Sequence, residues 1–199
     1  MRPPWLVSSW FFCCLVGAMG CSPSLTPPTY SAADVAAEAM KEYDTNKDGK
    51  LDATELERCP ALKDALAALD KDGDKALSKD ELEACLEEFL KSKVAIMGVT
   101  CKVTRGGEPL TGAEVTFIPE KFHGESIKPG SGSTDSQGIV NFQCKDQPLP
   151  GLSPGFYRAQ VSLKDANGTE TLPAQYNTQT KLGYFVSSHL RSHIRIKID

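Results

Sequence analysis

Residues 44–55 of this chain read DTNKDGKLDATE, and residues 70–81 read DKDGDKALSKDE. In both stretches a side chain bearing oxygen stands at the first, third and fifth positions, and a glutamate stands at the twelfth. Apolar residues flank the stretches at the spacing of a helix face: Met40, Tyr43 and Leu56 around the first, and Leu66, Leu69 and Leu82 around the second. The pattern predicts two helix–loop–helix units with short inner helices, because the two stretches start only 26 residues apart. Ser31 is predicted to cap the first helix and Pro60 to begin the third.

Both stretches resemble the calcium-binding loop of the EF-hand family. Such a loop surrounds Ca²⁺ with about six to eight oxygen ligands, including one backbone carbonyl at the seventh position and a bidentate glutamate at the twelfth. The resemblance implies these ligands in the first loop: Asp44, Asn46, Asp48, the carbonyl of Lys50, Asp52 through a water, and Glu55. It implies these in the second loop: Asp70, Asp72, Asp74, the carbonyl of Ala76, Ser78 and Glu81.

The two loops differ at the sixth position, where an EF-hand loop bends sharply. The first loop has Gly49 there, and the second has Lys75. A lysine in the left-handed region costs on the order of 1 kcal/mol, so we expect the second loop to bind calcium more weakly. Gly73 lies two residues earlier and does not replace the missing glycine directly. Leu51 and Leu77 share the eighth position and are expected to pair across the two loops.

The N-terminus has the pattern of an export signal. An apolar run at residues 5–19 follows Arg2 and is shorter than the roughly 20 residues of a membrane span. The run ends in Ala-Met-Gly-Cys at residues 18–21, which resembles a bacterial lipobox with Ala18 in place of the usual branched residue. The resemblance implies cleavage before Cys21 and lipidation of that cysteine. A plain secretory signal and an uncleaved anchor are the alternatives. The Pro/Ser-rich residues 22–30 read as a tether.

The second half of the chain is different in charge and in period. Residues 31–93 carry 17 acidic and 10 basic residues, whereas residues 94–199 carry 9 and 11, and neither half has a basic field for nucleic acid. Strand-like runs at residues 94–103, 113–118, 139–144, 156–163 and 193–198 alternate with Gly- and Pro-rich turns, which predicts a β-sandwich. The segments GEPL (107–110), GAEVTF (112–117) and PGFY (154–157) resemble the carboxypeptidase regulatory-like, or transthyretin-like, domain. The segment LPAQY (172–176) resembles bacterial lipoproteins of this type.

Four cysteines follow Cys21, and export would permit them to form disulfides. Cys59 and Cys85 each lie four residues after the last glutamate of a loop, and Cys101 and Cys144 fall in predicted strands. We therefore predict the pairs Cys59–Cys85 and Cys101–Cys144, with buried free thiols as the alternative.

No nucleophile elbow, phosphate-binding loop or dinucleotide-binding motif is present in the sequence, so we expect no enzyme activity. The clustered histidines and arginine of transthyretin-like hydrolases are not visible either. His189 and His193 are four residues apart, which leaves a weak metal site open, although exposed histidines at a strand edge are the simpler interpretation. The candidates for a carbohydrate site are aromatic: Tyr157, Tyr176, Tyr184 and Phe185.

Together these observations predict an α+β multidomain protein in four parts. They are a signal peptide (1–20), a lipidated cysteine with a tether (21–30), an all-α EF-hand pair (31–92) and an all-β immunoglobulin/prealbumin-like sandwich (93–199). We expect a non-catalytic Ca²⁺-binding or structural module, anchored by lipid to the outer membrane or cell envelope. Its expected partner is an envelope protein or a polysaccharide. One alternative is a carbohydrate-binding or hydrolase-accessory sandwich with calcium as a structural ion, and another is a calcium sensor that opens a groove.

Overall fold

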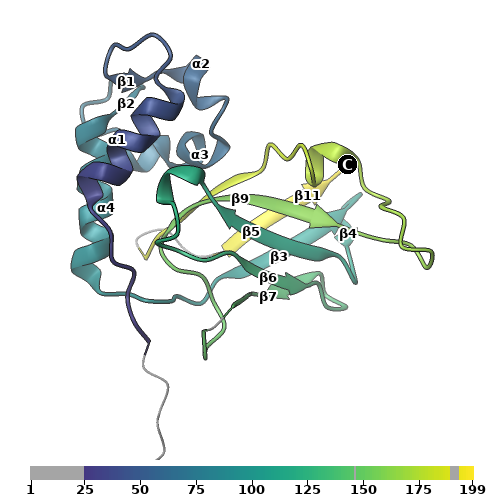
Figure 1. Cartoon of the computed structure of the whole chain (residues 1–199). Helices are drawn as coiled ribbons and strands as arrows, with labels where there is room; N and C mark the ends of the chain where they lie inside the picture. Colours follow the sequence, from purple (N-terminus) through teal and green to yellow (C-terminus); the bar gives the residue numbers. More distant parts are fainter. Residues whose placement is uncertain (1–24, 146, 189–192) are drawn as a thin grey trace, which may run out of the picture.

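The computed structural model describes residues 25–145, 147–188 and 193–199, and it places a group of helices beside a larger group of strands (Figure 1). The predicted signal peptide, Cys21 and His189 lie outside the described residues. Among the residues that are described, no helix combines the length and the apolar character needed to cross a bilayer.

The helical part consists of four helices and one two-stranded ribbon: α1 (Ala32–Tyr43), β1 (Lys50–Leu51), α2 (Ala53–Leu56), α3 (Pro60–Leu69), β2 (Leu77–Ser78) and α4 (Lys79–Ser92). The Ser31 side chain accepts a hydrogen bond from the Asp34 amide at 3.2 Å, so the predicted cap of α1 is confirmed. Pro60 is the first residue of α3, as predicted, where its missing N–H has no helical partner to lose. The predicted helix–loop–helix pair is therefore present, with a very short α2.

The strands form two further sheets. The five-stranded sheet has the order β10-β9-β5-β6-β8, and the other has the order β11-β3-β4, with β7 also paired to β3. Their bounds are β3 (Thr100–Arg105), β4 (Glu108–Pro109), β5 (Glu114–Pro119), β6 (Gly130–Ser133), β7 (Ile139–Asn141), β8 (Gln143–Cys144), β9 (Gly155–Ser162), β10 (Gly183–Val186) and β11 (His193–Ile198). Two short 3₁₀ helices, η1 (Lys121–His123) and η2 (Ala174–Tyr176), interrupt the connections. All pairs among these strands are antiparallel except β11 with β3.

One apolar core lies between the two sheets. Val103 of β3 and Ile196 of β11 belong to the same buried cluster as Phe117 of β5 and Tyr157 of β9. Tyr157 is fully buried, and its hydroxyl donates to the carbonyl of Ser153 at 2.8 Å, which satisfies its one polar atom. The chain thus has a helical part followed by two sheets that share a core. This order of elements agrees with the predicted α+β class.

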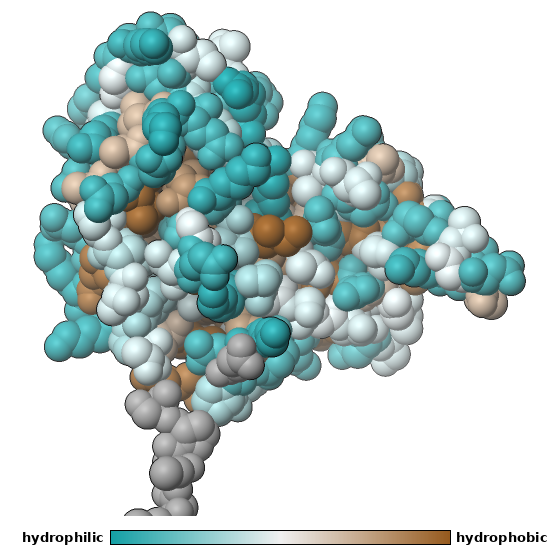
Figure 2. Space-filling view, viewed as in Figure 1, coloured by the Kyte–Doolittle hydropathy of each residue, from teal (hydrophilic) through white to brown (hydrophobic). Residues whose placement is uncertain are grey.

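A second apolar core joins the helices to the five-stranded sheet. Phe122 of η1, Phe156 of β9 and Phe185 of β10 pack into the cluster formed by the helices. The rings of Phe156 and Phe185 stack with centroids 5.0 Å apart, and Phe89 of α4 lies 5.9 Å from Phe185. Figure 2 shows that the outer surface in this view is mainly hydrophilic, with apolar residues visible only in small patches. The helices and the sheet therefore bury apolar surface against each other.

Candidate calcium-binding loops

In the first loop, residues 44–55, side-chain oxygens accept hydrogen bonds from backbone amides of the same loop. The two carboxylate oxygens of Asp44 accept hydrogen bonds from the amides of Lys47 (2.6 Å) and Gly49 (3.0 Å). Asn46 Oδ1 accepts from the Asp48 amide at 2.9 Å, and Asp48 Oδ1 accepts from the Lys50 amide at 2.9 Å. These bonds hold the side chains of the first, third and fifth positions on the inside of the loop.

Glu55 closes the first loop from the start of α2. One of its carboxylate oxygens accepts from the amides of Thr45 (2.6 Å) and Asn46 (3.2 Å), and the other accepts from the amide of Asp52 (3.1 Å). Asp52 in turn accepts from the amides of Thr54 and Glu55, which completes a capping box. Burial alone would raise the pKa of Glu55, but these amides outweigh it and lower the pKa. The glutamate is therefore held as a carboxylate, the form that binds a cation.

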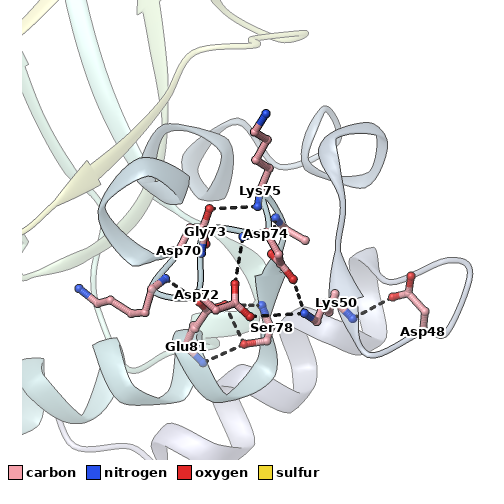
Figure 3. Close-up of polar contacts among 11 residues, drawn as sticks. Asp48, Lys50, Asp70, Asp72, Gly73, Asp74, Lys75, Ser78 and Glu81 are labelled. Atoms are coloured by element: carbon pink, nitrogen blue, oxygen red, sulfur yellow. Dashed lines mark hydrogen bonds and ion pairs between the residues drawn. The ribbon is translucent and has the colours of Figure 1, made fainter.

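The second loop, residues 70–81, repeats the hydrogen bonds of the first, position by position. The carboxylate of Asp70 accepts from the amides of Gly73 (2.7 Å) and Lys75 (3.0 Å). The remaining bonds also match: Asp72 accepts from Asp74 N (3.1 Å), Asp74 from Ala76 N (2.8 Å), and Glu81 from Lys71 N (2.7 Å) and Ser78 N (2.9 Å). Figure 3 shows these side chains gathered on the inside of the loop.

The second loop brings three carboxylates together. Oxygen atoms of Asp70, Asp72 and Asp74 all lie within 4.8 Å of one another. Ca²⁺ prefers oxygen ligands at about 2.3–2.6 Å, so one ion can contact such a group from its centre. The residues present in the second loop therefore fit calcium.

Backbone strain is present in both loops, whereas the sequence led us to expect it only at Lys75. Both loops require a positive φ at the fourth and the sixth positions. In the first loop these are Lys47 (φ 60°) and Gly49 (φ 87°), and in the second they are Gly73 (φ 78°) and Lys75 (φ 66°). Each loop thus has one glycine and one lysine in the left-handed region, in opposite order. Gly73 adopts its positive φ without strain at the fourth position of the second loop. The lysine at the sixth position therefore does not by itself make that loop a weaker calcium site.

A two-residue pairing joins the loops back to back. Lys50 pairs with Ser78, and Leu51 pairs with Leu77, in an antiparallel register. Both leucines are completely buried, so the predicted pairing across the loops is confirmed.

The side chain of Lys50 has a position that the sequence analysis missed. We assigned only its backbone carbonyl, yet its ammonium group contacts the carboxylate of Asp74 and lies 3.6 Å from that of Asp72 (Figure 3). The hydrogen bond to Asp74 raises the pKa of Lys50, and the same bond lowers the pKa of Asp74. The spacing within either loop gives no signal for this contact, because it depends on the pairing of Lys50 with Ser78 between the loops.

A polar link connects the first loop to the sheet. Tyr43, directly before the loop, donates from its hydroxyl to the carboxylate of Glu120 at 3.2 Å. Arg158 of β9 donates to the two oxygens of that carboxylate at 3.1 and 3.2 Å, and to the backbone carbonyl of Arg58 at 3.2 Å. Glu120 is only 2% exposed, so this ion pair lies in the junction and its polar atoms are satisfied there.

The two predicted disulfides are not formed, because all four cysteines are buried free thiols. Cys59 and Cys85 are equivalent in sequence but not in structure. The short α2 ends before Cys59, which becomes the residue preceding α3 and interacts with Tyr43, whereas Cys85 lies inside α4. Burial raises the pKa of both thiols to about 12.

The second predicted pair, Cys101 and Cys144, is separated because the run at residues 139–144 divides between the sheets. Its first part is β7, which pairs with β3 and places Val140 opposite Cys101. Its second part is β8, which pairs with β6 in the five-stranded sheet. There the thiol of Cys144 donates to the carbonyl of Gly151 at 3.3 Å, so its partner is backbone.

The aromatic candidates for a carbohydrate site do not form a concave surface. Tyr157 is fully buried, Tyr176 is 6% exposed and Phe185 is 8% exposed, and each belongs to one of the two apolar cores. Tyr184 packs against Phe117 with ring centroids 5.5 Å apart. His193 is exposed at the start of β11, and its predicted neighbour His189 is outside the described residues.

Comparison with known proteins supports the assignment of the helical part. Residues 36–60 and residues 62–86 each match the family model described as EF hand. No curated protein and no solved structure matches the chain. The two matched segments contain both loops, so the helical part is an EF-hand pair, which is followed by a part rich in strands.

Proposed function

We propose that this protein binds calcium at both loops and uses the ions to hold its helices in the shape that packs against the sheet. The observation that carries the proposal is the repeated set of inward hydrogen bonds in two loops that match the EF hand. The second loop adds three carboxylates within 4.8 Å of one another. Carboxylate and carbonyl oxygens are the ligands that Ca²⁺ prefers. Burial alone would raise the pKa of Glu55 and of Glu81, but hydrogen bonds from backbone amides outweigh it and lower both pKa values.

A structural role is favoured over a catalytic one by the packing of the helices. The side chains of Phe122, Phe156 and Phe185 fill the apolar face that α1, α3 and α4 turn toward the sheet. The loop ligands Asp44 and Asp70 directly follow α1 and α3, so an ion in either loop fixes where these helices end. Calcium would thereby stabilise the contact between helices and sheet.

We further propose that the protein is exported and anchored by lipid at Cys21, as a non-catalytic module facing an envelope protein or a polysaccharide. The support is the apolar run at residues 5–19, the cysteine that follows it and the Pro/Ser-rich tether at 22–30. The carboxypeptidase regulatory-like assignment of the second part is supported by its short motifs and by two sheets around one core.

Calcium titration by calorimetry tests the main proposal. We expect two sites in the wild-type chain, and loss of one site each in Glu55→Gln and Glu81→Gln, because each change removes an ionised ligand at position twelve. Glu57→Gln is the matched control, since Glu57 lies outside the loops with its side chain 64% exposed. At a calcium concentration about 100 times the dissociation constant, one site adds about 2.7 kcal/mol to the free energy of unfolding. Absence of calcium binding at millimolar concentration, with all variants equal to wild type, would refute the proposal.

A calcium sensor is the second candidate, and one groove favours it. A cavity of about 510 Å³ lies beside the second loop and is lined mainly by apolar side chains of α3, α4 and β10, among them Leu69, Cys85, Phe89 and Phe185. A sensor would widen this groove on binding calcium and take up a hydrophobic dye. Unchanged dye fluorescence between calcium-free and calcium-loaded protein would leave the structural role as the function.

A further inference from the structure

The ammonium group of Lys50 lies against two of the carboxylates that we expect to bind calcium in the second loop. Lys50 belongs to the first loop, but its side chain ends on Asp74 and Asp72, two of the three clustered carboxylates of the other loop (Figure 3). The contact arises because β1 and β2 pair Lys50 with Ser78, which brings the long side chain alongside the second loop. A lysine ammonium is a compact point charge on a flexible stem and can neutralise such a cluster.

Within the described part of the chain, no side chain of the second loop makes a reciprocal ion pair with the first loop. The seventh residue of the second loop is Ala76, whose methyl group cannot reach the first loop. Among the described residues, Asp44 and Asp48 form no ion pair with a lysine or an arginine. The first loop therefore presents its carboxylates to a free cation without an internal competitor.

The two loops are equal in their number of strained positions and in their number of predicted carboxylate ligands. Each has one glycine and one lysine at its two left-handed positions. Each also offers four carboxylates among its predicted ligands: Asp44, Asp48, Asp52 and Glu55 in the first, and Asp70, Asp72, Asp74 and Glu81 in the second. The position of the Lys50 side chain is thus the main asymmetry in charge between two otherwise matched sites.

We propose that Lys50 is a tethered counter-ion for the second loop, which lowers the calcium affinity of that loop and causes the first loop to fill first. This rests on the proposed calcium binding at both loops. Calcium enters the second loop as the ammonium leaves Asp72 and Asp74, and the lysine can move outward because its side chain is 43% exposed. The same side chain neutralises the second loop when calcium is scarce, which reduces repulsion among its carboxylates.

The test compares calorimetric calcium titrations of three single variants. Lys50→Met keeps the length of the side chain and the backbone carbonyl but removes the charge. Lys50→Arg keeps the charge, and Lys41→Met removes a lysine whose side chain is 74% exposed in α1 and pairs only with Glu38. We expect Lys50→Met to tighten the weaker site roughly three- to tenfold, because an exposed ion pair and the repulsion between two cations are both removed. The stronger site should change much less, and Lys50→Arg and Lys41→Met should resemble wild type.

Each site is assigned by repeating the titration with one loop disabled. In a Glu55→Gln background the second loop is measured alone, and Lys50→Met should still tighten it. In a Glu81→Gln background the first loop is measured alone, and Lys50→Met should leave it nearly unchanged.

The outcomes separate this inference from the proposed function. Two calcium sites with no difference between Lys50→Met and Lys41→Met would overturn the role of Lys50 and leave calcium binding intact. A single site in wild type, with a second site appearing in Lys50→Met, would support the inference in its strongest form. No calcium binding in any variant would overturn both.

Discussion

Acidification should weaken this protein through His123, a histidine buried in the junction between helices and sheet. The residue is 1% exposed and lies among the rings of Phe122, Phe156 and Tyr30, with centroids 4.9, 5.7 and 6.4 Å away. Its Nε2 accepts a hydrogen bond from the Phe156 amide at 3.1 Å, so the ring is neutral and carries its proton on Nδ1. Within the part of the chain that the structure describes, Nδ1 has no hydrogen-bond partner.

The size of the effect follows from the pKa. Burial lowers the pKa of His123 to about 3, whereas an unfolded histidine has a pKa of about 6.5. Between these values the unfolded chain binds the extra proton, so the free energy of unfolding falls as the pH falls. From pH 7 to pH 5 this single group should remove about 2 kcal/mol.

Urea unfolding at pH 7 and pH 5, in the presence of a chelator, measures this loss. The comparison is with His123→Gln, whose amide oxygen can accept from Phe156 but does not titrate. The wild-type protein should lose about 2 kcal/mol more than the variant over this interval. The exposed His193 is present in both proteins and cancels. Equal losses in the two proteins would refute the assignment of a neutral, proton-resisting histidine to this position.

Two further predictions concern the same junction. Gly183→Ala should destabilise the protein by about 1–3 kcal/mol in urea unfolding, because a Cβ at this position of β10 would overlap the backbone at the start of α3. Gly98→Ala, where a Cβ meets open space, should change little, and equal effects would contradict the close approach. Glu120→Gln should cost about 2 kcal/mol, since Arg158 loses its charged acceptor in a partly buried place. The control is Glu125→Gln, a side chain 96% exposed, and a cost as small as that of the control would show that the ion pair contributes nothing.

The sequence predicted the loops well because their structure depends on local spacing. Position, residue type and the turn geometry of Gly49 all lie within twelve consecutive residues, so no distant contact was needed. The first cap at Ser31 and the start of α3 at Pro60 were predictable for the same reason. Strands with clear alternation, such as β5, β9 and β11, were placed to within a residue or so.

Features that depend on the three-dimensional arrangement were missed. The strand β6 reads GSGS and has no apolar alternation, because its glycines lie against Leu152 and the backbone of Asn141, where a Cβ would overlap. The predicted Cys59–Cys85 pair relied on a symmetry between the two hands that the short α2 breaks. The reach of Lys50 into the second loop depends on the register of β1 with β2 and on side-chain direction, which spacing alone does not specify.

The shared aromatic packing has a consequence for how this chain can be divided. The sequence suggests a boundary near residue 93, yet Phe122, Phe156 and Phe185 are covered by residues that come before it. A fragment beginning at residue 93 would expose these three rings as one apolar patch, the kind of surface that promotes aggregation. The helices therefore shield these rings from water in the folded protein. Heat or denaturant should unfold both parts together. Calcium bound at the far end of the helices would in this way protect strands that it never touches.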